Sequence, residues 1–220
     1  MSLVADAVDS LLEASVVGSF TRLGPVLRRR TARWVPLEGR DLSGKVFVVT
    51  GATSGLGLET ARTLARLRGT VVIVGRDAAK CERVRRSIVD VIQGAGVHAV
   101  VADMGDLAAV RRAAGEILSL TPRVDVLVHN AGALDDVRTE SPQGIETTVA
   151  THVVGPWLLT HLLKPALARA APSRVLFVSS GGMYAEPPDA GSPELPADRY
   201  DGVRQYAKAK RAQVTLVPLL

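Results

Sequence analysis

The sequence predicts an α/β protein with a doubly wound parallel sheet, and three observations support that prediction. From Lys45 onward, short valine-rich runs bounded by turn residues alternate with longer amphipathic stretches. A glycine-rich turn joins the first such run to the next helical pattern. The chain has 220 residues, 47% of them hydrophobic, which is enough for one domain core. Strands and helices in this order imply right-handed crossovers and helices on both faces of the sheet.

Residues 1–40 form a separate N-terminal extension that is helical and basic. Val4, Val8 and Leu11 recur at helical spacing between acidic residues and predict an amphipathic helix. Gly24 and Pro25 predict the end of that helix and the start of a solvated basic linker. We expect the helix to pack on the main domain. The alternative is a peripheral membrane contact through residues 1–37, because apolar positions there accompany several arginines.

The elements of residues 41–220 follow from the same patterns. Strands are expected at 46–49, 71–74, 98–101, 124–128 and 175–178. Helices are expected near 55–68, 79–93, 107–118 and 142–170, with one more from about Val203. The proline-rich stretch 186–196 is expected to be a loop.

Charge and cysteine content exclude several classes of protein. The formal net charge is +5, but five arginines and no acid lie between Ala14 and Leu37, so the remainder is nearly neutral. Aromatic residues make up only 4%, and no zinc-finger spacing is present, so we expect no nucleic-acid partner. The single cysteine and the scattered histidines predict no disulfide and no metal site. A reducing, cytoplasmic location fits best.

A phosphate-binding loop is predicted directly after the first strand. Glycines allow the backbone to turn sharply and to approach a pyrophosphate at the N-terminus of the next helix. The spacing Thr-Gly-x-x-x-Gly-x-Gly is narrower than the general dinucleotide pattern, and a strand, a loop and a helix follow one another as required. The sequence therefore predicts a Rossmann-like dinucleotide-binding domain. The loop residues expected to bind the cofactor are Thr50, Gly51, Thr53, Ser54, Gly55, Leu56 and Gly57.

Five motifs in a fixed order resemble the short-chain dehydrogenase/reductase family over residues 41–220. They are the glycine loop, Asp103-Met104, Asn130-Ala131-Gly132, Ser180 and Tyr206-x-x-x-Lys210. The long interval before Tyr206 and the residues around it are most similar to retinol-dehydrogenase-like members. The resemblance implies an NAD(P)-dependent oxidoreductase with further strands after Leu220, so we expect a Rossmann-like sheet that is C-terminally incomplete.

The end of the second predicted strand bears on the choice of cofactor. An acid at this position binds the adenosine ribose of NAD, whereas an arginine nearby pairs with the extra phosphate of NADP. This chain has Gly75 and Arg76 there, and Asp77 suits a helix cap. The resemblance implies that NADP(H) is preferred over NAD(H). It also implies cofactor contacts by Asp103, Met104, Asn130, Ala131 and Gly132.

Tyr206, Lys210 and Ser180 are the candidate catalytic residues. Residues four apart on a helix share a face, so Tyr206 and Lys210 can act on one ligand. A free tyrosine ionises only near pH ~10, and a nearby ammonium stabilises the phenolate for proton exchange with a carbonyl or alcohol oxygen. Ser180 is expected to donate to that oxygen, with Ser179 as the neighbouring alternative. The resemblance implies that Tyr206 and Lys210 also contact the cofactor.

His152 is a further catalytic candidate, at a position where similar proteins carry an asparagine that connects the lysine to a proton-relay water. Histidine titrates near neutrality, so His152 would relay protons and steepen the pH dependence. The alternative is that histidine at this position weakens the proton relay.

Together these features predict an NADP(H)-dependent oxidoreductase that interconverts a carbonyl and an alcohol on an apolar small molecule. The alternative is a cofactor-binding protein that is catalytically incomplete or regulatory, favoured by His152 and by the few residues after Lys210. The resemblance implies a homodimer through the long helix that contains Trp157. The expected location is cytoplasmic, and the alternative is a peripheral contact with a membrane.

Overall fold

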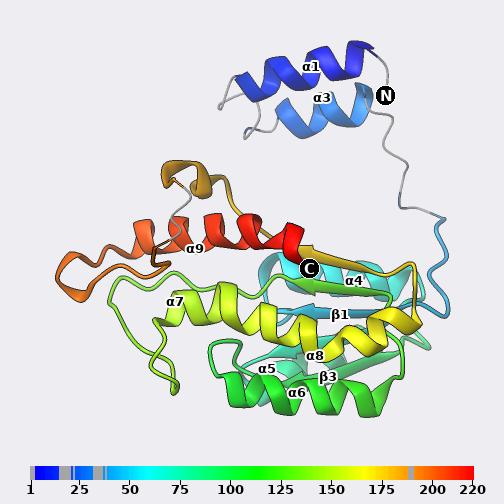
Figure 1. Cartoon of the computed structure of the whole chain (residues 1–220). Helices are drawn as coiled ribbons and strands as arrows, with labels where there is room; N and C mark the ends of the chain where they lie inside the picture. The colour runs from blue at the N-terminus through cyan, green and yellow to red at the C-terminus, as the bar shows by residue number, and fades with distance from the viewer. Residues whose placement is uncertain (1–2, 15–20, 22, 32–36, 38, 188–190) are drawn as a thin grey trace. The chain divides into compact units, whose positions relative to one another are not determined.

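The computed structural model describes residues 3–14, 21, 23–31, 37, 39–187 and 191–220. The chain divides into two compact units, Met1–Arg40 and Asp41–Leu220 (Figure 1). Among the described residues, no helix combines the length and the apolar character needed to cross a bilayer.

The first unit is a pair of helices, α1 (Leu3–Ala14) and α3 (Leu23–Thr31), which pack against each other. An ion pair of 2.5 Å between Arg28 Nε and Asp9 Oδ1 joins them. The prediction that Gly24 and Pro25 end a helix was wrong, because both lie in the first turn of α3. Proline is tolerated there, since the N–H groups of a first turn have no helical partner. Much of the predicted basic linker, residues 32–36, lies outside the described residues.

The second unit contains a parallel sheet with the strand order β3-β2-β1-β4-β5. The strands are β1 (Val46–Thr50), β2 (Thr70–Gly75), β3 (Val97–Val101), β4 (Val126–His129) and β5 (Arg174–Phe177). This confirms the predicted fold class, although β4 begins two residues later than expected. The chain reverses its direction of winding between β1 and β4, and such a switch point opens a ligand crevice at the carboxyl ends of the strands.

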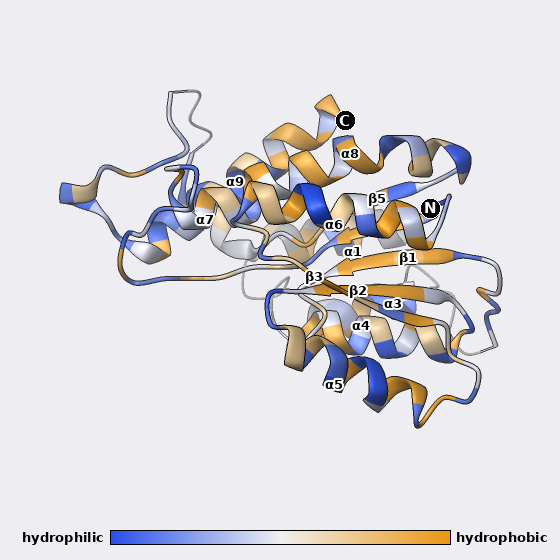
Figure 2. Ribbon diagram, turned by 90° about the horizontal axis from the view of Figure 1, so that it is seen from below, coloured by the Kyte–Doolittle hydropathy of each residue, from blue (hydrophilic) through white to orange (hydrophobic). Residues whose placement is uncertain are grey.

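Helices cover both faces of the sheet, as the apolar strands between them in Figure 2 show. One apolar cluster joins Val48 to helices α6 (Leu107–Leu120) and α8 (Gly155–Arg169). The other joins Val49 to α4 (Gly55–Arg66) and α5 (Ala78–Val89). Adjacent residues of β1 serve opposite clusters because successive strand side chains point to opposite faces.

The helix predicted over 142–170 is confirmed for residues 147–169, although it begins five residues later and contains a wide turn. The structure has a short helix α7 (Thr147–Val149), a wide π turn (Ala150–Val154) and then α8. Pro156 explains the wide turn, because it has no N–H to donate to the carbonyl of His152 four residues earlier. The last long helix, α9 (Gly202–Leu216), packs against α7 and this turn. Gln213 Nε2 of α9 donates to the freed His152 carbonyl at 2.7 Å.

Candidate functional site

The glycine loop after β1 lies close to the chain that leaves β4. Gly51 has a φ of +66°, and a Cβ there would come within 2.6 Å of the Ala131 Cα. A Cβ on Gly57 would collide with the Asn130 side chain and with the Gly51 carbonyl. Only glycine therefore fits at these two positions, where the loop packs against the chain that follows β4.

Thr50 and Asn130 hold the two sides of this crevice together. The Thr50 hydroxyl oxygen accepts from the backbone N–H groups of Asn130 and Ala131, each at 3.1 Å. Asn130 Nδ2 donates to the carbonyls of Thr50 and Gly51 at 3.1 and 3.2 Å. These two predicted cofactor residues thus shape the loop through its backbone.

The N-terminus of α4 points into the same crevice. Ser54 is the N-cap residue, yet its side chain makes no capping hydrogen bond. The first N–H groups of α4 therefore keep their capacity to donate to an anion, and the helix dipole favours a negative charge there.

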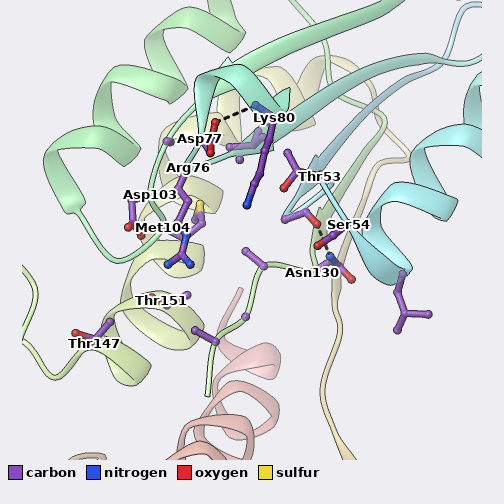
Figure 3. Close-up of a pocket in the computed structure, with 18 of the residues that line it drawn as sticks. Thr53, Ser54, Arg76, Asp77, Lys80, Asp103, Met104, Asn130, Thr147 and Thr151 are labelled. Atoms are coloured by element: carbon purple, nitrogen blue, oxygen red, sulfur yellow. Dashed lines mark hydrogen bonds between the residues drawn. The ribbon is translucent and has the colours of Figure 1, made fainter. Parts of the chain in front are cut away.

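A cavity of about 640 Å³ lies over the carboxyl ends of the first four strands (Figure 3). Most of the predicted cofactor residues line it, namely Gly51, Thr53, Ser54, Leu56, Arg76, Asp103, Met104, Asn130, Ala131 and Gly132. Gly55 and Gly57 belong to the loop but do not line the cavity, and neither do Ser180, His152, Tyr206 and Lys210. Three polar lining residues, Lys80, Thr147 and Thr151, were not predicted from the sequence, and Asp135, for which a solvated loop was the favoured interpretation, also lines the cavity.

Gly75 ends β2 in a tightly packed position. A Cβ there would lie 2.7 Å from Thr53 Cγ2 and 2.8 Å from Cys81 Sγ. An acidic side chain, which would bind the ribose hydroxyls of NAD, therefore has no room at residue 75.

Two cations face the cavity just beyond Gly75. Arg76 and Lys80 both line it, and in Figure 3 both side chains reach into the same space. Asp77 is confirmed as the cap of α5, because its carboxylate accepts from the Lys80 N–H at 2.9 Å. That cap starts α5 so that Lys80 falls in its first turn, next to Arg76.

Tyr206 and Lys210 lie on α9 as predicted, and Lys210 Nζ is 5.6 Å from the centroid of the Tyr206 ring. Lys210 is only 3% exposed, and its Nζ donates to the Val178 carbonyl at 2.7 Å. Burial lowers the pKa of Lys210 to about 8. The contact with Val178 holds the ammonium at the end of β5, where the two candidate serines follow.

The two serines after β5 have different partners. Ser179 Oγ donates to the Lys210 carbonyl at 3.3 Å, which ties this turn to α9. Ser180 Oγ accepts from the Gly182 N–H at 3.2 Å. As an acceptor in that bond, Ser180 keeps its own proton for donation to a ligand, which favours Ser180 over Ser179.

His152 lies beside Tyr206, with the ring centroids 5.3 Å apart and the planes perpendicular. Its Nε2 is 2.8 Å from the Ala133 carbonyl and 3.0 Å from the Ala133 nitrogen, while the buried Nδ1 has no partner among the described residues. A proton on Nε2 allows the bond to the Ala133 carbonyl, whereas an unprotonated Nε2 accepts from the Ala133 N–H, so a neutral ring makes one of these two bonds. Burial, aided by the charge of Lys210, lowers the pKa of His152 to about 4. His152 therefore stays neutral near pH ~7, and we expect no steepening of the pH dependence from its titration.

Acid is expected to destabilise the fold through two buried histidines. Burial lowers the pKa of His129 to about 3 and contributes most to the lowered pKa of His152. Below pH ~6.5 the unfolded chain binds a proton at each site and the folded chain does not, so stability falls as the pH falls. Urea unfolding at pH 7 and pH 5 should show a loss of about 2 kcal/mol per histidine.

Variants separate these histidines from other acid-sensitive groups. His152→Asn should remove about half of the loss. Variants of the exposed His98 and His161 to glutamine should retain all of it. An undiminished loss in His152→Asn would contradict the assignment.

Comparisons with known proteins agree with this geometry. The sequence profile described as short chain dehydrogenase matches residues 45–189. Dehydrogenase/reductase SDR family member 13 of Bos taurus is 40% identical over 79% of this chain and 46% of its own length. Retinol dehydrogenase 13 of Mus musculus is 31% identical over 93% of this chain and 61% of its own length. The chain thus spans about half the length of the curated relatives it matches.

Solved structures show the same architecture. A short chain dehydrogenase structure from Escherichia coli CFT073, complexed with NADPH, has a TM-score of 0.66 at 27% identity and covers 81% of this chain and 70% of its own. A metagenomic short-chain oxidoreductase in complex with NADP has a TM-score of 0.64 at 30% identity, covering 81% and 74%. With the glycine loop, the cavity and the Tyr206/Lys210 pair in the family's order, the chain belongs to the short-chain dehydrogenase family, and retinol dehydrogenases are among its relatives.

Proposed function

We propose that the protein is an NADP(H)-dependent oxidoreductase that interconverts a carbonyl and an alcohol on an apolar small molecule. The observation that carries the proposal is the buried ammonium of Lys210, 5.6 Å from the Tyr206 ring and hydrogen-bonded at the end of β5. An ammonium in that place stabilises a phenolate on the same helix.

The crevice suits a dinucleotide. Gly51 and Gly57 let the loop pack closely against Asn130 and Ala131, and the first N–H groups of α4 can receive a pyrophosphate. Arg76 and Lys80 offer charge-assisted hydrogen bonds to an adenosine phosphate. When bound, NADP(H) supplies or accepts the hydride at its nicotinamide ring.

The side chains of this chain handle the proton and the substrate oxygen. In reduction, the Tyr206 hydroxyl gives its proton to the carbonyl oxygen, and in oxidation the phenolate takes it back. Lys210 stabilises the phenolate through its charge. Ser180 donates a hydrogen bond to the same substrate oxygen and so orients that oxygen toward Tyr206.

An apolar substrate is supported by the names of relatives. Besides the retinol dehydrogenase, polyprenol dehydrogenase of Mus musculus is 36% identical over 81% of this chain and 54% of its own length. Both names denote apolar alcohols. A homodimer, a cytoplasmic location and a membrane contact through residues 1–37 stay predictions.

The test is a calorimetric titration with NADPH and then NADH, followed in the same sample by turnover of apolar ketones and aldehydes. Tight binding of NADPH with turnover supports the proposal. Binding without turnover favours the alternative, a cofactor-binding protein that is catalytically incomplete. Failure to bind either nucleotide contradicts both.

Arg76 and Lys80 are expected to set the preference for NADP(H). Arg76→Leu and Lys80→Met should each weaken NADPH binding by about 10- to 100-fold, because each removes a charged hydrogen bond to the phosphate. The affinity for NADH, which lacks that phosphate, should change by less than about threefold. Calorimetry with both nucleotides measures the difference.

Arg83→Leu is the matched control, because Arg83 is exposed on the same helix and does not line the cavity. Its NADPH affinity should equal that of the wild type. Equal losses of NADPH and NADH affinity in the Arg76 and Lys80 variants would mean that these cations do not bind the additional phosphate of NADPH.

A further inference from the structure

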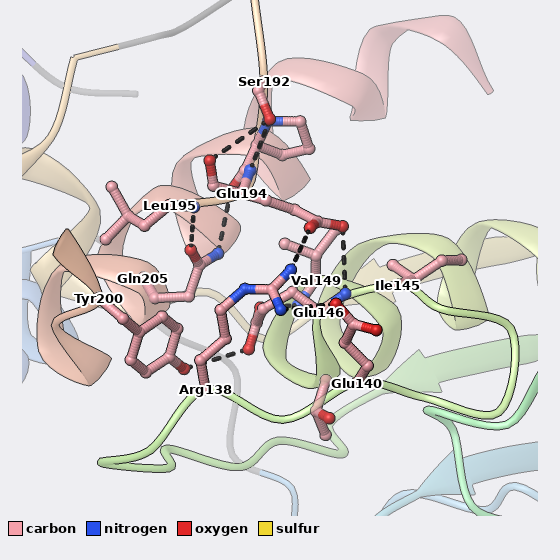
Figure 4. A network of polar contacts seen from close by, with 12 residues as sticks. Arg138, Glu140, Ile145, Glu146, Val149, Ser192, Glu194, Leu195, Tyr200 and Gln205 are labelled. Atoms are coloured by element: carbon pink, nitrogen blue, oxygen red, sulfur yellow. Dashed lines mark hydrogen bonds and ion pairs between the residues drawn. The ribbon is translucent and has the colours of Figure 1, made fainter. Parts of the chain in front are cut away.

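Gln205, the residue directly before Tyr206, binds the segment of chain that precedes α9. Its side chain is fully buried at 0% exposure. Gln205 Oε1 accepts from the Leu195 N–H at 2.7 Å, and Nε2 donates to the Pro193 carbonyl at 2.9 Å (Figure 4). The amide thus pairs with the segment as a neighbouring strand would, with one donor and one acceptor.

The same segment, residues 191–201, is also held on its opposite side. Glu194 accepts from Arg138 Nη2 and from the Glu146 N–H, both at 3.1 Å. The Tyr200 hydroxyl donates to Glu146 Oε1 at 3.1 Å. Glu146 is itself buried and caps α7, the helix that contains the cavity-lining Thr147. One polar network therefore joins the segment to α7 and to α9 (Figure 4).

The start of α9 is fixed against the cavity wall as well. Asp201 caps the helix by accepting from the Arg204 N–H at 2.9 Å. A Cβ on Gly202 would collide with the carbonyl of Asp135, which lines the cavity. The first turn of α9 is thus pressed against the cavity wall, one turn before Tyr206.

The position of the segment in the chain gives this network a role. It belongs to the connection between Ser180 and Tyr206, the two residues expected to contact the substrate oxygen. Gln205 is the point where segment 191–201 is bonded to the helix turn that carries the acid/base group.

We propose that Gln205 is a positioning residue that holds segment 191–201 and Tyr206 as one unit; this inference rests on the proposed function. A neutral amide suits the task because it donates to Pro193 and accepts from Leu195 at once. Methionine has a similar length but neither group. An ionised glutamate would set a negative charge against the Pro193 carbonyl, whereas a protonated one would restore both bonds.

The experiment compares Gln205→Met and Gln205→Glu with the wild type. Two readouts need no turnover: hydrogen exchange at the Leu195 amide and the carbon-13 tyrosine resonance of Tyr206, which is one of three tyrosines in the chain. We expect Leu195 exchange at least about tenfold faster in Gln205→Met, with a displaced Tyr206 resonance and NADPH affinity within about threefold of the wild type. With an active wild type, kcat should fall about 10- to 100-fold and change more than KM.

Gln143→Met is the matched control, because the Gln143 side chain also makes two hydrogen bonds, to Asp106 Oδ1 at 3.0 Å and from the Leu107 N–H at 3.1 Å. It should leave all these readouts unchanged. If Gln205→Met does not fold, Gln205→Glu decides: its Leu195 exchange and Tyr206 resonance should approach wild type at pH ~5 and depart from it at pH ~8.

Unchanged Leu195 exchange and an unchanged Tyr206 resonance in a folded Gln205→Met would overturn the proposal, as would pH-independent behaviour of Gln205→Glu. Absence of turnover in the wild type would count against the proposed function instead. The two resonance and exchange readouts would still decide whether Gln205 couples the segment to Tyr206.

Discussion

Tyr206→Phe is expected to lower kcat by about 10²- to 10⁴-fold, the range that a general acid/base contributes. The substitution removes only the hydroxyl, and the perpendicular contact of the ring with His152 is retained. NADPH affinity and the free energy of unfolding should therefore stay near the wild-type values. Steady-state turnover of an apolar ketone, calorimetry with NADPH and urea unfolding measure the three quantities.

Thr215→Val is the control for this experiment, since Thr215 is exposed on the same helix as Tyr206 and also loses one hydroxyl. Its kcat should stay within about twofold of the wild type. A Tyr206→Phe variant with kcat within tenfold of the wild type would show that another group moves the proton. A parallel collapse of stability would show that the hydroxyl is needed for the fold.

Lys210→Met is expected to raise stability near neutral pH while it abolishes turnover. Burial lowers the pKa of Lys210 from 10.5 to about 8, so the folded state carries the charge at a cost of about 3 kcal/mol at pH 7. Methionine removes that cost but leaves the Val178 carbonyl without its donor, a loss of about 1 kcal/mol. The net gain at pH 7 should be about 2 kcal/mol.

The pH dependence of this gain identifies its cause. Between pH ~8 and ~10.5 the unfolded chain binds more protons at Lys210 than the folded chain, so wild-type stability rises with pH and the gain of Lys210→Met shrinks to about zero by pH ~10. Urea unfolding of both proteins from pH 7 to pH 10 measures it. Lys164→Met, at an exposed position of α8, should show no such trend. A gain that is constant with pH would mean that desolvation of the ammonium is not its origin.

The sheet could be predicted because each strand is a short apolar run with glycine or polar residues near its ends, and the central strands β1, β2 and β4 are mostly buried. Val48 and Val49 are both fully buried, on opposite faces of β1, which is why the run shows no polar alternation. Helices α4, α5 and α6 were predicted from one apolar face each. The phosphate loop was predictable from its glycine spacing between a strand and a helix, although the contacts that require Gly51 and Gly57 come in part from Asn130 and Ala131 after β4.

The remaining features depend on contacts between residues far apart in the sequence. The wide turn before α8 arises from Pro156 but is completed by Gln213, 61 positions after His152. Gln205 appears on the sequence as an ordinary helix residue, and only the fold brings Pro193 and Leu195 to it. Hydrogen bonds between such distant residues leave no periodic pattern in the sequence.

His152 and Lys80 illustrate two kinds of missing information. The sequence indicated only the ordinary pKa of a histidine, whereas burial and the charge of Lys210 lower the pKa of His152 to about 4. Lys80 had a usable signal, because a residue three positions after the cap Asp77 falls in the first turn of α5, beside Arg76. The helix pattern alone did not distinguish that lysine from its exposed neighbours.

The packing around Gly75 restricts how a preference for NADH could evolve or be engineered in this protein. An aspartate at the end of β2 would favour NADH, but its Cβ would meet Thr53 and Cys81 at 2.7 and 2.8 Å. With a single substitution, the side chains of Thr53 and Cys81 would therefore have to move. A route to NADH specificity must first shrink both neighbours, for example through Thr53→Ser and Cys81→Ala, and only then introduce the acid.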